Sequence, residues 1–151
     1  MRSVELFKTL SQMCNERIAF QKMLAFQLVS LDPEVSLQFE FHKTLIGHPA
    51  HNRLHGGVIS SALDSVAGLS LMKAIADKFH DESISNIMLH RFSKLGTIDL
   101  RVDFVRQGVG AHFLASATVT RLGGKVGFCQ MKLVNDQDLL IATGAASFIV
   151  S

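Results

Sequence analysis

Several classes of protein depend on residues or patterns that this chain has little of. Among its 151 residues only Cys14 and Cys129 are cysteines, which excludes a disulfide-stapled scaffold and a cysteine-rich zinc site. We expect both to be free thiols in a reducing compartment. Lys and Arg number 15 against 13 Asp and Glu, and the net charge of +2 is too small to indicate a nucleic-acid-binding surface.

Signals for export or membrane insertion are also missing. No uninterrupted run of about 18 apolar residues occurs, so we expect no membrane-spanning helix. The N-terminal pattern contains Glu5, Lys8, Glu16 and Arg17, which does not suit the core of a signal peptide. The sequence therefore predicts a cytoplasmic protein. Its length and its hydrophobic fraction of 48% predict one folded domain over residues 1–151.

The spacing of apolar residues predicts an α+β protein. Residues 3–17 repeat apolar side chains at helical spacing, and residues 34–42 alternate as a half-buried strand does. Residues 57–77 are apolar on nearly all sides, which is typical of a buried helix. The expected order is a helix over 3–17, strands over 24–31 and 34–42, an irregular stretch over 44–55, the buried helix over 57–77, a short helix or loop over 80–95, and strands over 97–104, 111–121, 125–134 and 139–150.

Turn residues join the last strands. Gly123-Gly124 and Asn135–Asp138 each lie between two predicted strands and are hairpin signals. We expect the last four strands to form a meander. Five or six antiparallel strands would then wrap the long buried helix, with the N-terminal helix packed on this unit.

The strongest local feature is His55-Gly56-Gly57 at the start of the long helix. Glycines there leave backbone N–H groups unobstructed, and a helix N-terminus can polarise a carbonyl or hold an anion. An ordinary loop-to-helix turn is the alternative. Asp64 is the only charged residue between Arg53 and Lys73. A carboxylate on such an apolar helix suits a general base or nucleophile. The alternative is that the helix is less buried than expected and water solvates Asp64.

The spacing of Gly56 and Asp64 constrains how they act together. Eight residues of helix separate them, which is about 12 Å along the axis. Both groups cannot approach one reacting carbon within the same chain. A shared site requires a second subunit, and antiparallel helices across a two-fold axis would form a dimer with two equal sites.

Histidines gather just before the helix. His48, His51 and His55 follow each other closely, with His42 nearby, and no Cys or acidic residue falls within this stretch. Zinc needs three or four ligands in one geometry. We therefore expect a polar loop here and no metal site, with a metal-binding protein as the distant alternative.

Two stretches of the chain resemble a known family. LHGGVISSALDSVAGL at 54–69 and GTIDLRVDFVRQG at 96–108 are similar to the PaaI-like acyl-CoA thioesterases of the hotdog fold. The likeness is greatest to the YigI-type subgroup, which acts on medium- and long-chain acyl-CoA. The resemblance implies hydrolysis of an acyl-CoA thioester without a separate cofactor, by a homodimer or by a homotetramer built from such dimers.

The resemblance also implies roles for single residues. Gly56 matches the backbone N–H donor to the thioester carbonyl, and His55 matches the residue that shapes its turn. Asp64 matches the catalytic carboxylate, which acts as nucleophile or as general base toward water. Thr97 matches a Ser or Thr that holds the water or orients the carboxylate. In the family, the glycine and the aspartate of one site belong to different subunits.

In one loop the chain departs from the family pattern. Many members carry an Asn six residues before the histidine, and here that position is Pro49. Asn52 and His48 are the nearest candidates to assist the carbonyl in its place.

Substrate contacts are expected around these residues. Gly57 and Val58 follow Gly56 and are candidates to contact the substrate. The phosphates of CoA need cations, and an acyl chain needs an apolar slot. The candidates for the phosphates are Arg106, Arg121 and Lys125, and those for the slot are Met23, Leu24, Ile59, Leu63 and Met88, with residues 80–95 as a cover.

Two further functions stay open on the same fold. A non-catalytic acyl-CoA binding or sensor protein is the main alternative, although a pure binder has no need of Asp64 and Thr97. A hydratase or dehydratase would pair an acid with a histidine, and the helix offers no histidine near Asp64.

Overall fold

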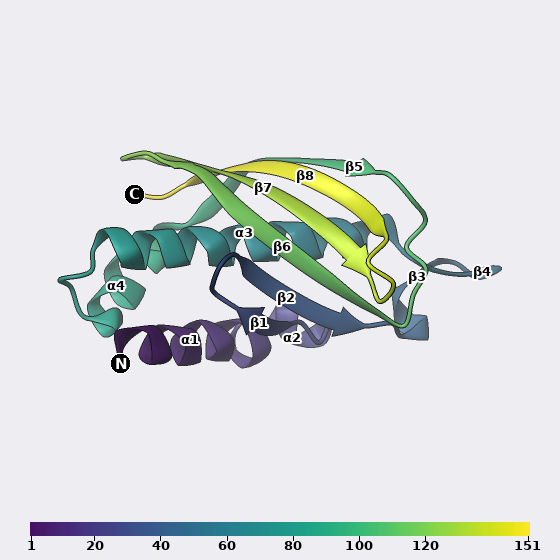
Figure 1. The fold of residues 1–151 in the computed structure, drawn as a ribbon, viewed down its shortest axis with the longest axis horizontal. Coiled ribbons are helices and arrows are strands. Elements are labelled where there is room, and N and C mark those ends of the chain that lie inside the picture. The colour runs from purple at the N-terminus through teal and green to yellow at the C-terminus, as the bar shows by residue number, and fades with distance from the viewer.

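A long helix, α3 (Gly56–Lys78), lies in the concave face of one antiparallel sheet (Figure 1). The computed structural model describes residues 1–151, and its six-stranded sheet has the order β1-β2-β6-β7-β8-β5. This arrangement confirms the predicted α+β class, with a long helix wrapped by an antiparallel sheet. The strands are β1 (Gln27–Ser30), β2 (Val35–Glu40), β5 (Gly96–Phe104), β6 (His112–Leu122), β7 (Val126–Asn135) and β8 (Leu140–Ile149).

Helix α3 is the central element of the core. Small side chains let the sheet approach it, and a Cβ on Gly68 would lie 3.5 Å from the Phe148 ring. By length and composition alone, an 18-residue window of α3 with mean hydropathy 1.4 would be long and apolar enough to cross a membrane. However, 61% of that window is buried inside the fold, as in the core helix of a globular domain.

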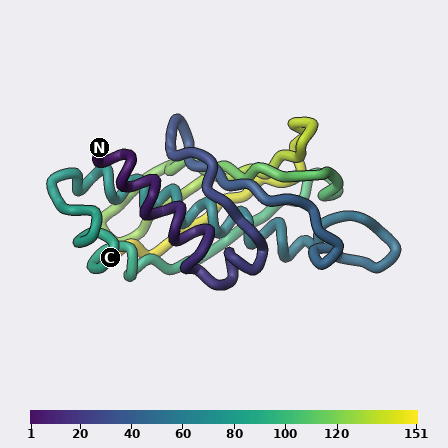
Figure 2. The backbone as a smooth tube through the Cα atoms, turned by 90° about the horizontal axis from the view of Figure 1, so that it is seen from below, coloured from purple at the N-terminus to yellow at the C-terminus, as the bar shows by residue number.

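The N-terminal segment forms a further layer beside α3 (Figure 2). Helix α1 (Arg2–Gln12) buries Leu6 and Leu10 at a spacing of four residues, and a π-helical turn over Met13–Arg17 buries Cys14. The predicted helix over 3–17 is therefore confirmed, with a wider last turn. Helix α2 (Ala19–Met23) follows, where no element was expected.

Strand β5 contradicts the expected meander. Its partner is β8, with Thr97 opposite Phe148, whereas β6 pairs with β2 and β7. The two hairpin turns keep β6, β7 and β8 adjacent, but they leave both edges of that unit free. The link over residues 105–111 carries the chain from β5, beside β8, to β6 on the far side of β7. As a result β5 is an edge strand with one unpaired side.

A hairpin replaces the irregular stretch expected over residues 44–55. Strands β3 (Ile46–His48) and β4 (His51–Leu54) pair only with each other, and they project from the end of the molecule where α3 begins (Figure 1). The segment expected as a short helix or loop forms α4 (Ile84–His90) and a 3-10 turn over Phe92–Lys94.

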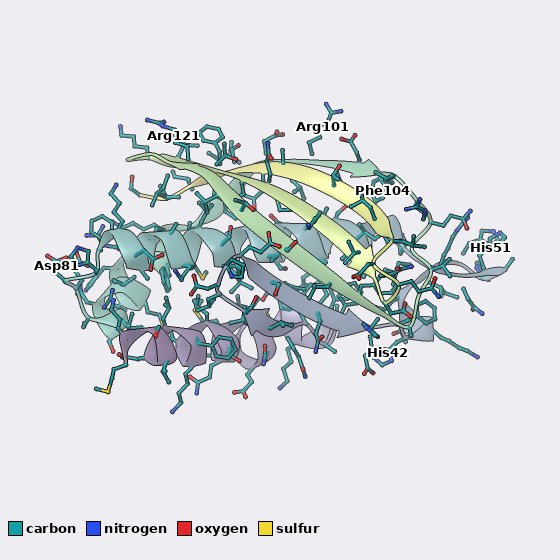
Figure 3. All side chains as sticks on the ribbon, viewed as in Figure 1. His42, His51, Asp81, Arg101, Phe104 and Arg121 are labelled. Atoms are coloured by element: carbon teal, nitrogen blue, oxygen red, sulfur yellow. The ribbon has the colours of Figure 1, made fainter.

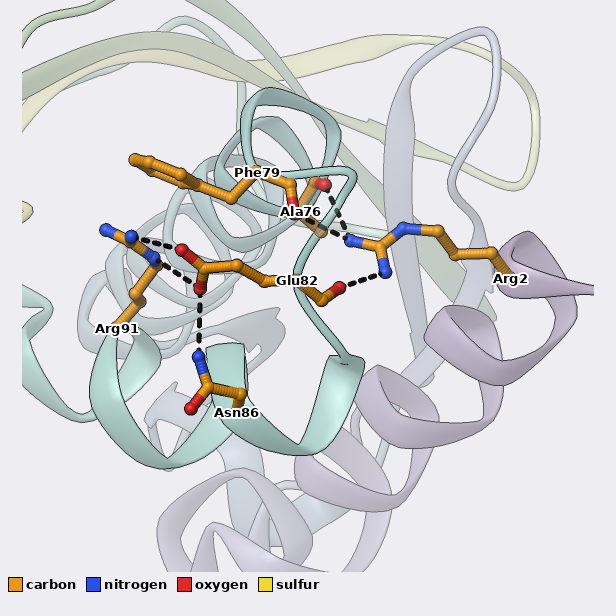
Figure 4. Close-up of polar contacts among 6 residues, drawn as sticks. All are labelled: Arg2, Ala76, Phe79, Glu82, Asn86 and Arg91. Atoms are coloured by element: carbon orange, nitrogen blue, oxygen red, sulfur yellow. Dashed lines mark hydrogen bonds and ion pairs between the residues drawn. The ribbon is translucent and has the colours of Figure 1, made fainter.

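Side chains at the other end of α3 join three segments (Figure 4). The Arg2 guanidinium donates to the carbonyls of Ala76, Phe79 and Glu82 at 3.0, 3.2 and 2.6 Å. The bonds to Ala76 and Phe79 satisfy acceptors that the C-terminus of α3 leaves unpaired within the helix. Arg91 forms a 2.6 Å ion pair with Glu82 and stacks over the Phe79 ring. The N-terminal segment is thus tied to the end of α3.

Candidate functional site

Asp64 lies on a half-buried stripe of α3, next to the first residues of β5. The Thr97 hydroxyl donates a 2.8 Å hydrogen bond to Asp64 Oδ1, which leaves the other carboxylate oxygen free of any bond within the chain. The structure thus brings together two candidate residues that are far apart in the sequence. The carboxylate faces a pocket and not the core, so it is open to a ligand.

The pocket in front of Asp64 has a volume of about 430 Å³ and a largely apolar wall. It follows one side of α3 from Ser61 to Met72. The N-terminal segment forms the opposite wall. The remaining lining residues are Met13, Ile18, Phe20, Gln21, Ser65, Gly68, Leu69, Phe92, Leu95, Gly96 and Phe148, together with Asp64 and Thr97.

The residues proposed for the acyl slot do not line this pocket. Leu24, Ile59 and Leu63 are buried in the core, Met23 is 70% exposed, and none of these residues lines the Asp64 pocket; Met88 is half-buried on α4 and does not line it either. Periodicity showed only that such residues are apolar, not which wall they form. Of the segment proposed as a cover, Phe92 and Leu95 do reach the pocket.

At the start of α3 one backbone donor is available. His55 is the N-cap, and its Nδ1 accepts a 2.7 Å hydrogen bond from the Gly57 N–H. A Cβ on Gly57 would lie only 2.9 Å from that nitrogen, so a larger residue there would displace the His55 ring from its capping position. The Gly56 N–H has no acceptor within the chain. Val58 follows in the same turn, half-buried against the core.

The remaining polar candidates lie on the projecting hairpin. His48 and Asn52 are exposed, and His48 Nδ1 accepts from the Ala50 N–H at 3.0 Å. The rings of His48 and His51 lie 5.2 Å apart, and Figure 3 shows His51 on the hairpin that projects from the molecule. No group of three or more His, Cys, Asp or Glu side chains has a metal-binding arrangement.

The cationic candidates occupy two ends of the molecule. Arg106 follows β5, and its guanidinium donates to the Leu140 carbonyl at 2.7 Å. Two residues further on, the Gly108 carbonyl accepts from the Leu54 N–H, which places this segment beside the start of α3. Arg121 and Lys125 flank the β6–β7 turn at the opposite end, where Figure 3 labels Arg121. One chain therefore does not gather all three at a single phosphate.

Neither cysteine is suited to nucleophilic chemistry. Burial raises the pKa of the Cys14 thiol to about 11, and burial also raises the pKa of Cys129, which lies against Ser70 and the Ala67 carbonyl. Both are free thiols. At neutral pH both stay protonated, and neither lines the Asp64 pocket.

Comparisons with known proteins identify the family of the chain. The model of the thioesterase superfamily matches residues 51–142. The medium/long-chain acyl-CoA thioesterase YigI of Escherichia coli K12 is 34% identical over 147 residues, which cover 97% of this chain and 94% of that protein.

Two solved structures share the fold. A Shewanella oneidensis protein related to the thioesterase superfamily has a TM-score of 0.91 and 31% identity, over 99% of this chain and 97% of that one. The Escherichia coli PaaI protein has a TM-score of 0.76, over 100% of this chain and 96% of that one. At 16% identity it supports the fold alone. The chain therefore belongs to the thioesterase superfamily, and its architecture is the hotdog fold.

Proposed function

We propose that the protein is a cytoplasmic acyl-CoA thioesterase that hydrolyses medium- to long-chain acyl-CoA to the free acid and CoA. One observation carries this proposal: the Asp64 carboxylate, held by the Thr97 hydroxyl, faces a largely apolar pocket. The similarity to YigI, named as a medium/long-chain acyl-CoA thioesterase, supports the substrate class.

The carbonyl contact comes from a second copy of the chain. Gly56 and Asp64 lie on the same helix, about 12 Å apart along its axis. A homodimer with antiparallel α3 helices would bring Gly56 of the partner subunit to Asp64. The unpaired edge of β5 supports this assembly, because Ile98 and Phe104 on β5, and Val105 directly after it, are each more than half exposed. Such dimers can pair again into tetramers.

Hydrolysis then needs few groups. Asp64 takes a proton from water, and the water oxygen bonds to the thioester carbon. The N–H of Gly56 of the partner subunit stabilises the developing oxyanion. The C–S bond breaks next, and the CoA thiolate leaves and takes up a proton. In the alternative, an Asp64 oxygen attacks the carbon directly, expels the thiolate and forms an anhydride that water then cleaves.

The pocket sets a scale for the acyl group. From Asp64 to Met72 the groove covers eight residues of helix, or about 12 Å. An extended chain advances about 3.5 Å for every three bonds, so roughly ten carbons fit this length. Of the three candidate cations, Arg106 lies at the end of the molecule where α3 begins and would contact the CoA phosphates of a substrate that enters there, whereas Arg121 and Lys125 would contribute from the far end.

The test is a thiol-release assay on acyl-CoA substrates of two to eighteen carbons, with Asp64→Asn alongside. We expect turnover that peaks at medium or long chains and is lost in the variant. Binding of acyl-CoA without turnover on any chain length would support the non-catalytic binding protein instead. A single turnover in ¹⁸O-labelled water separates the two chemical routes, because only anhydride cleavage at the Asp64 carbon places ¹⁸O in that side chain.

A further inference from the structure

We propose that Gln21 is a further positioning residue of this site and that its side-chain carboxamide orients the attacking water against Asp64. This inference rests on the hydrolysis proposed above. It names a residue of the N-terminal segment, outside the stretches that match the thioesterase pattern.

Gln21 carries an unpaired polar atom. The residue lies on α2 with 9% of its surface exposed, and its Oε1 is the only buried side-chain nitrogen or oxygen in the chain that has no hydrogen-bond partner. More than about 90% of buried polar groups in proteins are paired. Leaving one unpaired costs about 1–3 kcal/mol. As placed, Oε1 is enclosed by the chain, so it can meet a partner outside the chain only once the carboxamide turns.

Gln21 lies in the wall of the Asp64 pocket. It borders the same 430 Å³ space as Asp64 and Thr97. Its backbone is held in place, because the Gln21 carbonyl accepts a 3.0 Å bond from the Phe26 N–H. The terminal torsion of a glutamine side chain is broad, so the carboxamide can turn either polar atom toward the pocket.

The chemistry of the attacking water fits two acceptors. To direct a lone pair at the thioester carbon, the water has to donate both of its O–H groups elsewhere. One oxygen of Asp64 is already bonded by Thr97, and the other can accept the first O–H and later its proton. Gln21 Oε1 can accept the second O–H. Gln21 gains and loses no proton in this step, so it positions the water and does not act as base.

A Gln21→Met variant tests this role. Methionine has a similar length and no group that accepts a strong hydrogen bond, so the packing is kept while the acceptor is lost. We expect kcat to fall by about 10²-fold, as for a misplaced reactant. The KM for acyl-CoA should change less than threefold. The thermal midpoint should stay constant or rise, because an unpaired buried polar atom is removed. Gln12→Met, at an exposed position of α1, is the matched control and should keep the wild-type kcat.

Each outcome decides the proposal. A Gln21→Met enzyme with wild-type kcat, beside an inactive Asp64→Asn enzyme, would overturn the role of Gln21 and leave the proposed function intact. Absence of thiol release from the wild type would overturn both. Gln21→Leu is a second variant that checks whether loss of the carboxamide affects folding. A large drop in the thermal midpoint of both Gln21→Met and Gln21→Leu would show that the carboxamide is structural and would overturn the proposal.

Discussion

Replacing Gly56 by proline removes the proposed oxyanion donor without an expected cost to the fold. Position 56 is the first residue of α3, where proline is favoured because it has no N–H to lose to the helix. The residue before a proline has to be extended, and His55 already is, at φ −59° and ψ 136°. The Gly56 N–H has no acceptor in the chain, so no internal hydrogen bond is lost.

The two expected effects have opposite signs. Loss of one oxyanion donor lowers kcat by about 10²–10³-fold, or roughly 2.7–4 kcal/mol. A proline with compatible backbone angles stabilises the fold by about 0.4–1 kcal/mol, since the unfolded chain has fewer conformations. The added Cβ meets only the Phe104 side chain, at 3.3 Å, and this side chain is 55% exposed and can move aside.

Gly56→Ala is the matched control, because alanine adds the same Cβ and keeps the N–H. Thiol release at saturating substrate and the thermal midpoint should be measured for both variants and the wild type. We expect Gly56→Ala to remain within a few-fold of wild type and Gly56→Pro to lose activity while remaining folded. Equal losses in the two variants would refute the donor role and indicate a steric effect, and an active proline variant would refute it outright.

Three further predictions concern the carboxylate, the acyl groove and acid stability. Thr97→Val removes the 2.8 Å bond to Asp64 at an exposed edge position, and steady-state assays should show kcat reduced by about tenfold with an unchanged thermal midpoint. Phe20→Ala opens the apolar wall, so kcat/KM should fall for ten-carbon acyl-CoA but not for acetyl-CoA. Phe7→Ala, on α1 and outside this pocket, should leave kcat/KM unchanged for both substrates. The Ala111 N–H bonds Asp136 Oδ1 at 2.9 Å and holds the pKa of that carboxyl below its usual range. This bond stabilises the fold above the unfolded-state pKa of about 3.9, and the contribution is lost as the pH falls through the lower folded value. Urea midpoints of wild type should therefore decline more steeply than those of Asp136→Asn between pH 6 and pH 3, and parallel curves would contradict this assignment.

Local patterns were sufficient to predict the central helix and most strands. Alternation over residues 34–42 and from 97 onward predicted β2 and the four long strands, because each records which side chains face the core. The apolar run after Gly57 predicted α3, and a lone Asp64 within it marked the candidate carboxylate. The helical rise alone also showed that Gly56 and Asp64 need separate subunits to meet.

Long-range contacts decided the rest. Hairpin turns specify neighbours only across a short connection, so the place of β5 beside β8, and with it the Thr97–Asp64 bond, depended on the whole sheet. The pocket wall likewise joins the N-terminal segment to α3 and β5, and no local spacing relates Phe20 or Gln21 to Asp64. The candidate catalytic residues can thus be read from the sequence, whereas the cavity in front of them arises only when distant segments pack together.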